Sequence, residues 1–109
     1  MDTPLSARLR KQAGGPRDGA LLRFSIGNAL MTEGDVAGAA TEFRAATAFD
    51  PRYSAAWKLL GSALDASGDS FAAEQAWEQG IAVAHERGDT QAAKEMQVFL
   101  RRLRKRIAT

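Results

Sequence analysis

The sequence predicts an all-α fold in which two consecutive helix-turn-helix repeats are followed by a C-terminal capping helix. A shift of 34 residues superimposes segment 20–53 on segment 54–87. A Gly-Asp pair falls at the same place in both segments, and apolar residues recur at helical spacing on either side of it. The residues that coincide under this shift are Ile26 with Leu60, Gly27 with Gly61, Ala29 with Ala63, Leu30 with Leu64, Ala39 with Ala73, Phe43 with Trp77 and Ala48 with Ala82.

Composition limits the classes of protein that the chain can belong to. Its 109 residues suffice for one domain with a small core. It has no cysteine and one histidine, His85, so a disulfide framework, a thiolate nucleophile and a zinc site have little to build on. We favour a surface or helix-end role for His85 and expect no cofactor. No apolar run approaches the roughly 18 residues of a membrane span, and no signal-peptide core is present, so we expect a cytoplasmic protein.

Charge is distributed unevenly along the chain. Residues 1–17 carry four basic side chains and one acidic side chain, residues 18–100 carry six basic and twelve acidic ones, and residues 101–109 carry five basic ones. An acidic body therefore lies between two basic ends, although the net charge of the whole chain is only +2.

The first 18 residues are predicted to form a flexible or loosely docked N-terminal segment. A short helix is possible within residues 2–13, with Thr3 or Ser6 as its N-cap. The Gly-Gly-Pro sequence at residues 14–16 ends any such helix, because proline cannot continue it.

The first hairpin is expected to consist of a helix at 19–33 and a helix at 36–49. Asp18 is a plausible N-cap for the first of these helices. Between them, Gly34 supplies the left-handed conformation that ends a helix, and Asp35 caps the next one. The second helix stops before Pro51, since the residue preceding a proline avoids the helical region.

The second hairpin repeats this pattern, with helices at 53–66 and 70–87 and with Gly68 and Asp69 at the turn. The last helix is predicted at 89–107, after a stop at Gly88, with Asp89 as its cap. Its apolar residues fall on one stripe at helical spacing: Ala92, Met96, Phe99, Leu100, Leu103 and Ile107.

The 34-residue period, with a small residue inside each first helix and Gly-Asp between the helices, resembles the tetratricopeptide repeat (TPR) family. The resemblance implies an α-α superhelix, with a TPR domain at 19–107 that divides into repeat 1 (20–53), repeat 2 (54–87) and a cap helix (89–107). The layout is similar to that of small single-domain bacterial TPR proteins. Three positions depart from the family pattern: Arg23, where an aromatic residue is usual, Gly80, where alanine is usual, and His85, where proline is usual.

The resemblance also implies a protein-protein interaction module of the adaptor, co-chaperone or assembly-factor type, and not an enzyme. In TPR proteins the first helix of each pair lines a concave groove that holds a peptide or a helix of another protein. Carried over to matching positions, the peptide-binding groove residues are Phe24, Asn28, Met31, Lys58, Ser62 and Asp65. The cap helix could add Met96 and either Phe99 or Leu100. We expect a protein or peptide partner, and a monomer in preference to a dimer.

A more specific hypothesis for two of the groove residues is a carboxylate clamp. Asn28 and Lys58 occupy two positions of the carboxylate clamp that some TPR domains use, but Phe24 and Ser62 replace other clamp residues. We therefore favour Asn28 and Lys58 as solvated groove residues.

A basic patch at the C-terminal end of the last helix comprises Arg101, Arg102, Arg104, Lys105 and Arg106. Cations at this end of a helix complement its macrodipole, by roughly 0.3–1 kcal/mol each when exposed. The alternative function is binding of nucleic acid or of an acidic surface through residues 101–106. No aromatic residue lies between these bases, so we regard nucleic acid as the less favoured partner.

Overall fold

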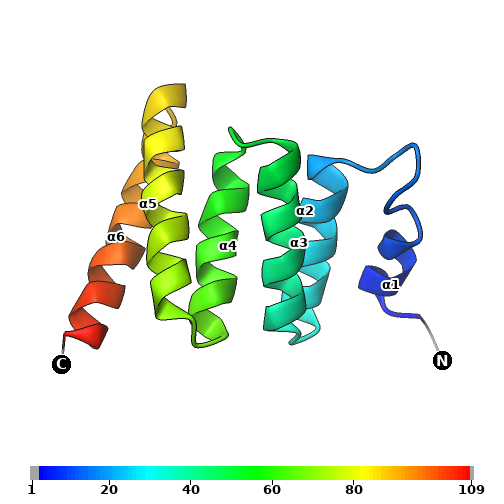
Figure 1. The fold of residues 1–109 in the computed structure, drawn as a ribbon, viewed down its shortest axis with the longest axis horizontal. Coiled ribbons are helices and arrows are strands. Elements are labelled where there is room, and N and C mark those ends of the chain that lie inside the picture. Colours follow the sequence, from blue (N-terminus) through cyan, green and yellow to red (C-terminus); the bar gives the residue numbers. More distant parts are fainter. Residues whose placement is uncertain (1–2, 109) are drawn as a thin grey trace.

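The computed structural model describes residues 3–108, which form six α-helices and no β-strand (Figure 1). The predicted all-α fold class is therefore confirmed. The helices are α1 (Leu5–Arg10), α2 (Ala20–Thr32), α3 (Val36–Phe49), α4 (Ser54–Ala66), α5 (Ser70–Arg87) and α6 (Thr90–Ile107). The hairpins α2-α3 and α4-α5 lie side by side, with α1 at one end of the row and α6 at the other (Figure 1). The row is flat, with principal extents of 44 × 31 × 19 Å.

Acidic N-caps begin the helices that follow the turns, as predicted. The side chains of Asp35, Asp69 and Asp89 accept hydrogen bonds from backbone N–H groups in the first turns of α3, α5 and α6, at 2.9, 3.1 and 3.2 Å. The glycine that precedes each of these caps has a φ between 73° and 88°, in the left-handed region that other residues avoid. This recurring turn fixes the start of each second helix.

The expected caps of the first two helices were wrong. The N-cap of α1 is Pro4, without a side-chain bond, and Ser6 instead donates to Glu33 of α2. The N-cap of α2 is Gly19, because the Asp18 carboxylate is already occupied: it accepts hydrogen bonds from the Arg23 guanidinium and from two backbone N–H groups. In both cases another side chain, Glu33 for Ser6 and Arg23 for Asp18, displaced the capping contact with the helix end.

Inside each hairpin, a glycine of the first helix faces an aromatic ring of the second. A Cβ atom at Gly27 would lie 2.5 Å from the Phe43 ring, and one at Gly61 would overlap the indole of Trp77. Phe43 is fully buried, and Trp77 is 2% exposed. The absent side chain therefore provides the space that each aromatic ring fills, and the 34-residue sequence repeat has a direct structural counterpart.

The C-terminal helix α6 packs against α5 and also touches α4. Met96 is fully buried, and its sulfur would overlap a Cβ atom at Gly80. Gly80 departs from the family pattern at a position where Met96 of α6 and Trp57 of α4 crowd α5 from two sides. Ser54 of α4 donates a 2.8 Å hydrogen bond to the Asp89 carboxylate before α6, which lowers the pKa of Asp89. The helix thus closes the core of the second hairpin.

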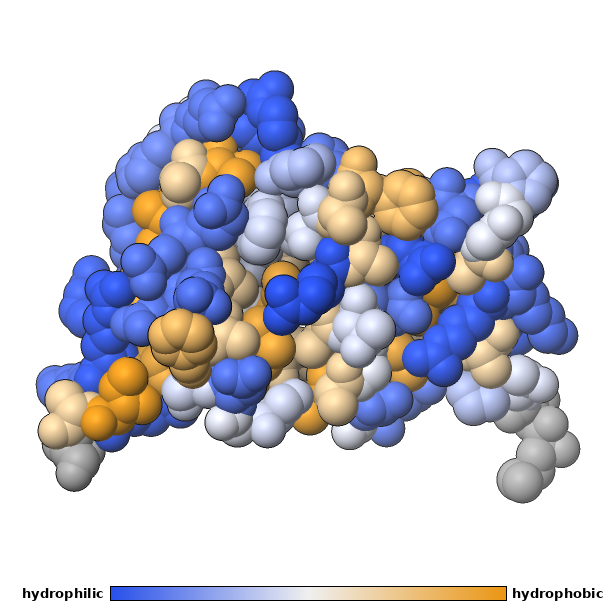
Figure 2. Space-filling model, viewed as in Figure 1, coloured by the Kyte–Doolittle hydropathy of each residue, from blue (hydrophilic) through white to orange (hydrophobic). Residues whose placement is uncertain are grey.

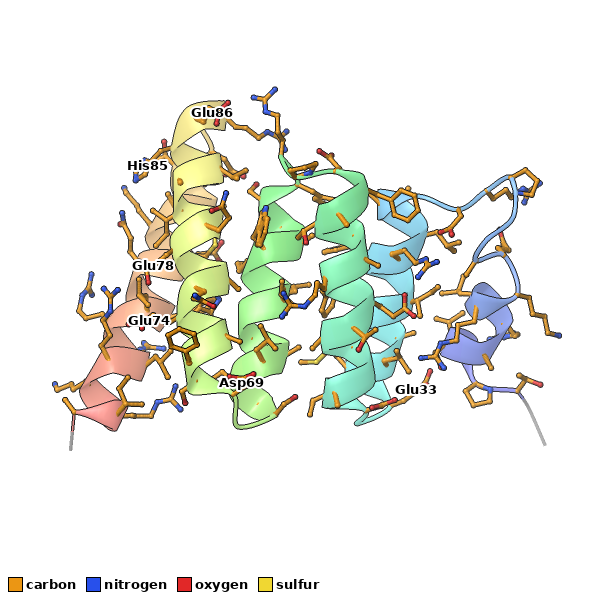
Figure 3. The ribbon with its side chains drawn as sticks, viewed as in Figure 1. Glu33, Asp69, Glu74, Glu78, His85 and Glu86 are labelled. Atoms are coloured by element: carbon orange, nitrogen blue, oxygen red, sulfur yellow. The ribbon has the colours of Figure 1, made fainter. Side chains whose placement is uncertain are left out.

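The N-terminal helix α1 is docked on α2. The backbone N–H and the hydroxyl of Ser6 both donate to the Glu33 carboxylate, at 3.1 and 2.5 Å, and Figure 3 shows Glu33 on the side of α2 that faces α1. Residues 1–2 of the expected N-terminal segment lie outside the described residues. The described part of this segment is therefore held by specific hydrogen bonds to the second helix.

An ion network explains why Arg23 stands where an aromatic residue is usual. Its guanidinium binds the Asp18 carboxylate at 2.8 Å and the Glu42 carboxylate of α3 at 3.2 Å, and it lies 5.9 Å from the centre of the Phe49 ring. The Arg23 hydrogen bond is the main reason that the pKa of Asp18 lies well below its ordinary value. Arg23 thus links the N-terminal loop to both helices of the first hairpin.

Polar and charged side chains cover most of the face shown in Figure 2, and apolar residues appear there as separate patches. The exposed large hydrophobic residues are distributed over several elements: Leu5, Leu21, Phe49, Phe71 and Ile107. Within residues 3–108, no helix is both long enough and apolar enough to cross a membrane.

Candidate functional site

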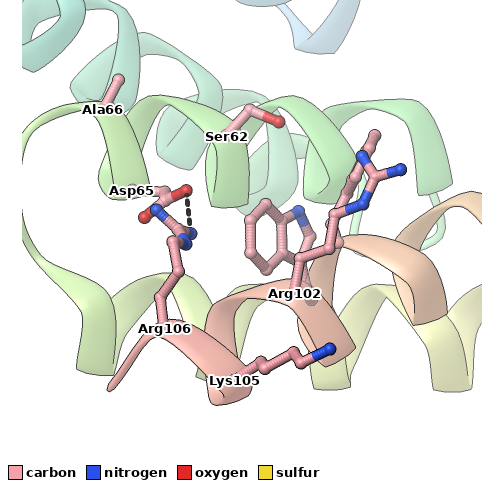
Figure 4. Close-up of a pocket in the computed structure, with 8 residues that line it drawn as sticks. Ser62, Asp65, Ala66, Arg102, Lys105 and Arg106 are labelled. Carbon is pink, nitrogen blue, oxygen red and sulfur yellow. Dashed lines mark hydrogen bonds and ion pairs between the residues drawn. The ribbon is translucent and has the colours of Figure 1, made fainter. Parts of the chain in front are cut away.

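A cleft of about 680 Å3 lies between α4 and the C-terminal half of α6 (Figure 4). Helix α4 contributes one wall, α6 contributes the other, and one residue comes from α5. The lining residues are Ser62, Asp65, Ala66, Trp77, Phe99, Arg102, Lys105 and Arg106. Aromatic and apolar surface thus meets a group of cations at a single concave site.

The floor of this α4/α6 cleft is aromatic. The rings of Trp77 and Phe99 lie 5.5 Å apart, centre to centre, at a tilt of 44°. The indole N–H of Trp77 donates a 3.0 Å hydrogen bond to the backbone carbonyl of Lys58, and Gly61 leaves room for the ring. Because its hydrogen-bonding group is satisfied and it is only 2% exposed, Trp77 supports the floor from within the core, and the partly buried Phe99 ring supplies the accessible apolar surface.

Two ion pairs cross from α4 to α6, one on each side of the aromatic floor. Near the start of both helices, the Lys58 ammonium lies 3.2 Å from the Glu95 carboxylate. Near their ends, the Arg106 guanidinium lies 2.8 Å from the Asp65 carboxylate, the contact dashed in Figure 4. Lys58 and Asp65 are seven residues apart on α4, so the space between the two bridges is about 10 Å long.

The structure divides the predicted basic patch into two groups. Arg104 turns to α5, where its guanidinium lies 2.7 Å from the Glu74 carboxylate and 3.5 Å from the Glu78 carboxylate, and the hydrogen bond that it donates to Glu74 raises the pKa of Arg104. Figure 3 shows both glutamates on the side of α5 that lies next to α6. In contrast, Arg101, Arg102 and Lys105 are exposed and form no ion pair within residues 3–108.

Of these three cations, only Arg102 and Lys105 line the cleft. In Figure 4 both side chains extend from α6, across from Ser62, Asp65 and Ala66 of α4. The lining therefore holds three cations and one carboxylate, and one of those cations is already paired with that carboxylate.

The predicted groove residues do not share one site. Ser62 and Asp65 line the α4/α6 cleft, whereas Lys58 is held by Glu95 at its edge. Asn28 is exposed and lines a separate, smaller groove of about 330 Å3 between α1 and α2. Asn28 and Lys58, the two clamp positions, therefore line different parts of the molecule.

The remaining two predicted groove residues belong mainly to the packing of the first hairpin. Phe24 stacks on Tyr53, with ring centres 4.8 Å apart, and on Phe43 at 5.7 Å. Met31 is partly buried and packs against the hydrophobic core. Burial in this cluster, with a smaller contribution from Asp50, raises the pKa of Tyr53.

The sequence favours a core role for Trp77 over a ligand cage, and Trp77 is indeed 2% exposed; Ala66 is not singled out by the sequence pattern. A signal for the cleft was nevertheless present, because Phe99, Arg102 and Arg106 recur at helical spacing and therefore lie on one face of the last helix. His85 is exposed and lies 3.4 Å from the Gln97 amide. Within residues 3–108, no cluster of three or more potential metal ligands occurs.

Comparison with known proteins places the chain in a family. No family model matches it. It is 54% identical over 86 residues to the TPR repeat-containing protein PA0015 of Pseudomonas aeruginosa, a match that covers 79% of this chain and 82% of that protein. The solution structure of protein BPP2914 from Bordetella parapertussis is also similar, with a TM-score of 0.81 and 44% identity over 99% of this chain and 93% of that one.

TPR proteins are generally non-enzymatic scaffolds whose stacked hairpins present surfaces to other proteins. Three observations point to the same family: the helical architecture, the sequence identity to PA0015, and the glycine-aromatic contact that recurs as Gly27 with Phe43 and as Gly61 with Trp77. The chain belongs to the TPR repeat-containing proteins and is, at the level of its family, a protein-protein interaction module.

Proposed function

We propose that this chain is an adaptor, co-chaperone or assembly-factor type of module that holds a peptide or a helix of another protein in the α4/α6 cleft. The observation that carries this proposal is the partly exposed Phe99 ring, which packs on the buried Trp77 at the base of a cleft with three cations in its lining, in a family of interaction modules. Interface energy tends to concentrate where a partner side chain enters such an apolar pocket, surrounded by polar groups.

The cleft suits a protein segment better than a reactive small molecule. Its polar groups are the Ser62 hydroxyl, which donates to a backbone carbonyl of its own helix, the Asp65-Arg106 ion pair, and two further cations. No nucleophile in this set is paired with a base, so the arrangement favours recognition and not bond breaking. We propose a monomer as the working form.

A position-specific crosslinking experiment tests this function. Because the chain has no cysteine, a photo-crosslinker can be attached to a single introduced cysteine. Ala66→Cys places it at the cleft, and Ala82→Cys places it on an exposed part of α5 that lines no part of this cleft. We expect Ala66→Cys, but not Ala82→Cys, to crosslink to a discrete protein partner in a lysate of the native host.

A substitution of Phe99 in the aromatic floor tests whether the crosslink depends on the cleft. Phe99→Ala, combined with Ala66→Cys, removes one wall of the aromatic floor and should abolish that crosslink, while circular dichroism verifies that the helices remain. Equal crosslinking from Ala66→Cys and Ala82→Cys, or crosslinking that survives Phe99→Ala, would show that the cleft is not the working surface.

The ion pairs weaken the alternative of nucleic-acid binding. Arg104 and Arg106 are engaged by carboxylates of α5 and α4, so the basic patch offers fewer cations to phosphates than its sequence indicates. The observations therefore favour a protein partner over nucleic acid.

A further inference from the structure

We infer that the α4/α6 cleft selects an acidic segment of its partner that carries one large apolar side chain. This inference rests on the proposed function, and adds to it the chemistry of the bound segment. Three observations lead to it: the apolar floor, the charge of the lining, and the spacing of the two ion pairs that cross the cleft.

The floor calls for an apolar side chain. Trp77 donates its only polar hydrogen to the Lys58 carbonyl, and Phe99 has no polar atom, so neither ring supplies a hydrogen bond to a ligand. An aromatic or large aliphatic side chain would bury the exposed part of the Phe99 ring from water at no polar cost, whereas Trp77 beneath it is already buried.

The charge of the lining calls for acidic neighbours. Arg102 and Lys105 stand at the cleft without a carboxylate partner within residues 3–108, whereas Arg104 on the same helix is bound by Glu74 and Glu78. With Arg106 and Asp65 included, the lining carries a net charge of +2, although residues 18–100 as a whole are acidic. A basic segment would be repelled here, and an acidic one attracted.

The two crossing ion pairs limit the length of the inserted part. About 10 Å separates Lys58 from Asp65 along α4, which is the length of roughly three residues of extended chain. The cleft therefore has room for one large side chain of the bound segment. The acidic residues on either side of that side chain would lie over Arg102 and Lys105 at the rim. Recognition would then depend on a short internal sequence and not on a free chain end.

Four short fluorescent peptides of equal length, all with amidated ends, test the inference with the intact protein. One carries Phe flanked by Glu, and the others replace Glu by Gln, Glu by Lys, or Phe by Ala. Fluorescence polarisation should give the tightest binding for the Glu-Phe peptide, with a loss of roughly tenfold or more for each replacement. Equal binding of the Gln or Lys peptide, or of the Ala peptide, would overturn the inference.

Charge-reversal variants locate the interaction. Arg102→Glu and Lys105→Glu should each weaken binding of the Glu-Phe peptide by roughly tenfold. Arg101→Glu is the matched control, since Arg101 is exposed on the same helix, forms no ion pair within residues 3–108 and lies outside the cleft lining; it should change binding by less than about twofold. An equal effect of all three substitutions would indicate general charge attraction and would contradict the inference.

The outcomes separate this inference from the proposed function. If the Ala66→Cys crosslink forms but the peptides show no preference for acid and aromatic residues, the cleft is a binding site of different selectivity and only the inference fails. If none of the four peptides binds, the inference is wrong, and the crosslink decides the function independently. If a short single-stranded RNA binds more tightly than the Glu-Phe peptide and loses binding with Arg102→Glu, nucleic acid replaces the acidic segment as the ligand.

Discussion

The backbone of Gly61 lies against the indole of Trp77 so closely that a methyl group on Gly61 would overlap the ring. A rotation of the indole away from this methyl group would break the hydrogen bond from its N–H to the Lys58 carbonyl and the contact of its ring with Phe99. We therefore expect Gly61→Ala to destabilise the fold by about 1–3 kcal/mol, in spite of the higher helix propensity of alanine. Urea unfolding followed by circular dichroism measures this change.

A control and a double substitution separate overlap from other effects. Gly19→Ala adds the same methyl group where a Cβ atom meets nothing within 4 Å, so it should cost only the roughly 0.5–1 kcal/mol expected for alanine in place of glycine at a helix N-cap. Combining Gly61→Ala with Trp77→Leu should cost less than the sum of the two single changes, because the smaller side chain relieves the overlap. Additive costs would argue against the contact.

Docking of α1 depends on the Glu33 carboxylate, which accepts both hydrogen bonds from Ser6. Glu33→Ala should release α1 and raise the rate of amide hydrogen exchange in residues 5–10, while the exchange of buried amides in α4 stays unchanged. Hydrogen exchange with mass spectrometry measures both regions. Thr41→Ala, an exposed change on α3, is the control, and protection of α1 that survives Glu33→Ala would show that apolar contacts alone hold it.

The Asp18 carboxyl should titrate well below its ordinary pKa of 3.8, chiefly because the Arg23 guanidinium stabilises its charged form. A pKa that is lower in the folded than in the unfolded state adds stability above about pH 4, and this contribution is lost as the pH falls through the folded pKa. Carboxyl chemical shifts in an NMR titration report the midpoint. Arg23→Met should raise it, whereas Arg44→Met, on the exposed side of α3, should leave it in place.

Removal of α6 should unfold or oligomerise the chain. Truncation after Gly88 uncovers the faces of Trp77 and Gly80 that α6 covers with Phe99 and Met96. Calorimetry and light scattering would detect the loss of a cooperative transition or the formation of larger species. A truncated chain that stays monomeric with a sharp transition would contradict this expectation.

A single substitution in α6 tests the same packing without removing the helix. Met96→Ala should cost about 2–5 kcal/mol, because the side chain is fully buried against Gly80 and leaves a cavity. Lys94→Ala, two residues earlier on the exposed face of the same helix, should have little effect on the unfolding free energy.

Helices α3 and α5 could be predicted to the residue because the signals that delimit them are local. Asp35 and Asp69 cap their starts, Pro51 forbids continuation of α3, and Gly88 adopts the left-handed conformation that ends α5. Each signal acts within a few positions along the chain, so no knowledge of the tertiary structure is needed.

The α4/α6 cleft could not be predicted in the same way, since its defining contacts join distant positions. Lys58 meets Glu95 across 37 residues, and Arg106 meets Asp65 across 41. A carboxylate cannot be assigned to one of several nearby cations from sequence spacing alone, which is why the basic patch looked uniform and Arg104 could not be distinguished from Arg102. The Asp18 cap failed although Arg23 is only five residues away, because two local partners competed for one carboxylate and the guanidinium was a stronger partner than the helix end.

The matching contacts of Gly27 with Phe43 and of Gly61 with Trp77 make the hairpin a modular building block. Each block presents the same kind of interior to its successor, while α1 and α6 cover the two ends of the row. A duplicated copy of residues 54–87, inserted in tandem, would therefore elongate the array by one unit and leave both covers in register. Growth of such a protein by gene duplication requires no redesign of its ends.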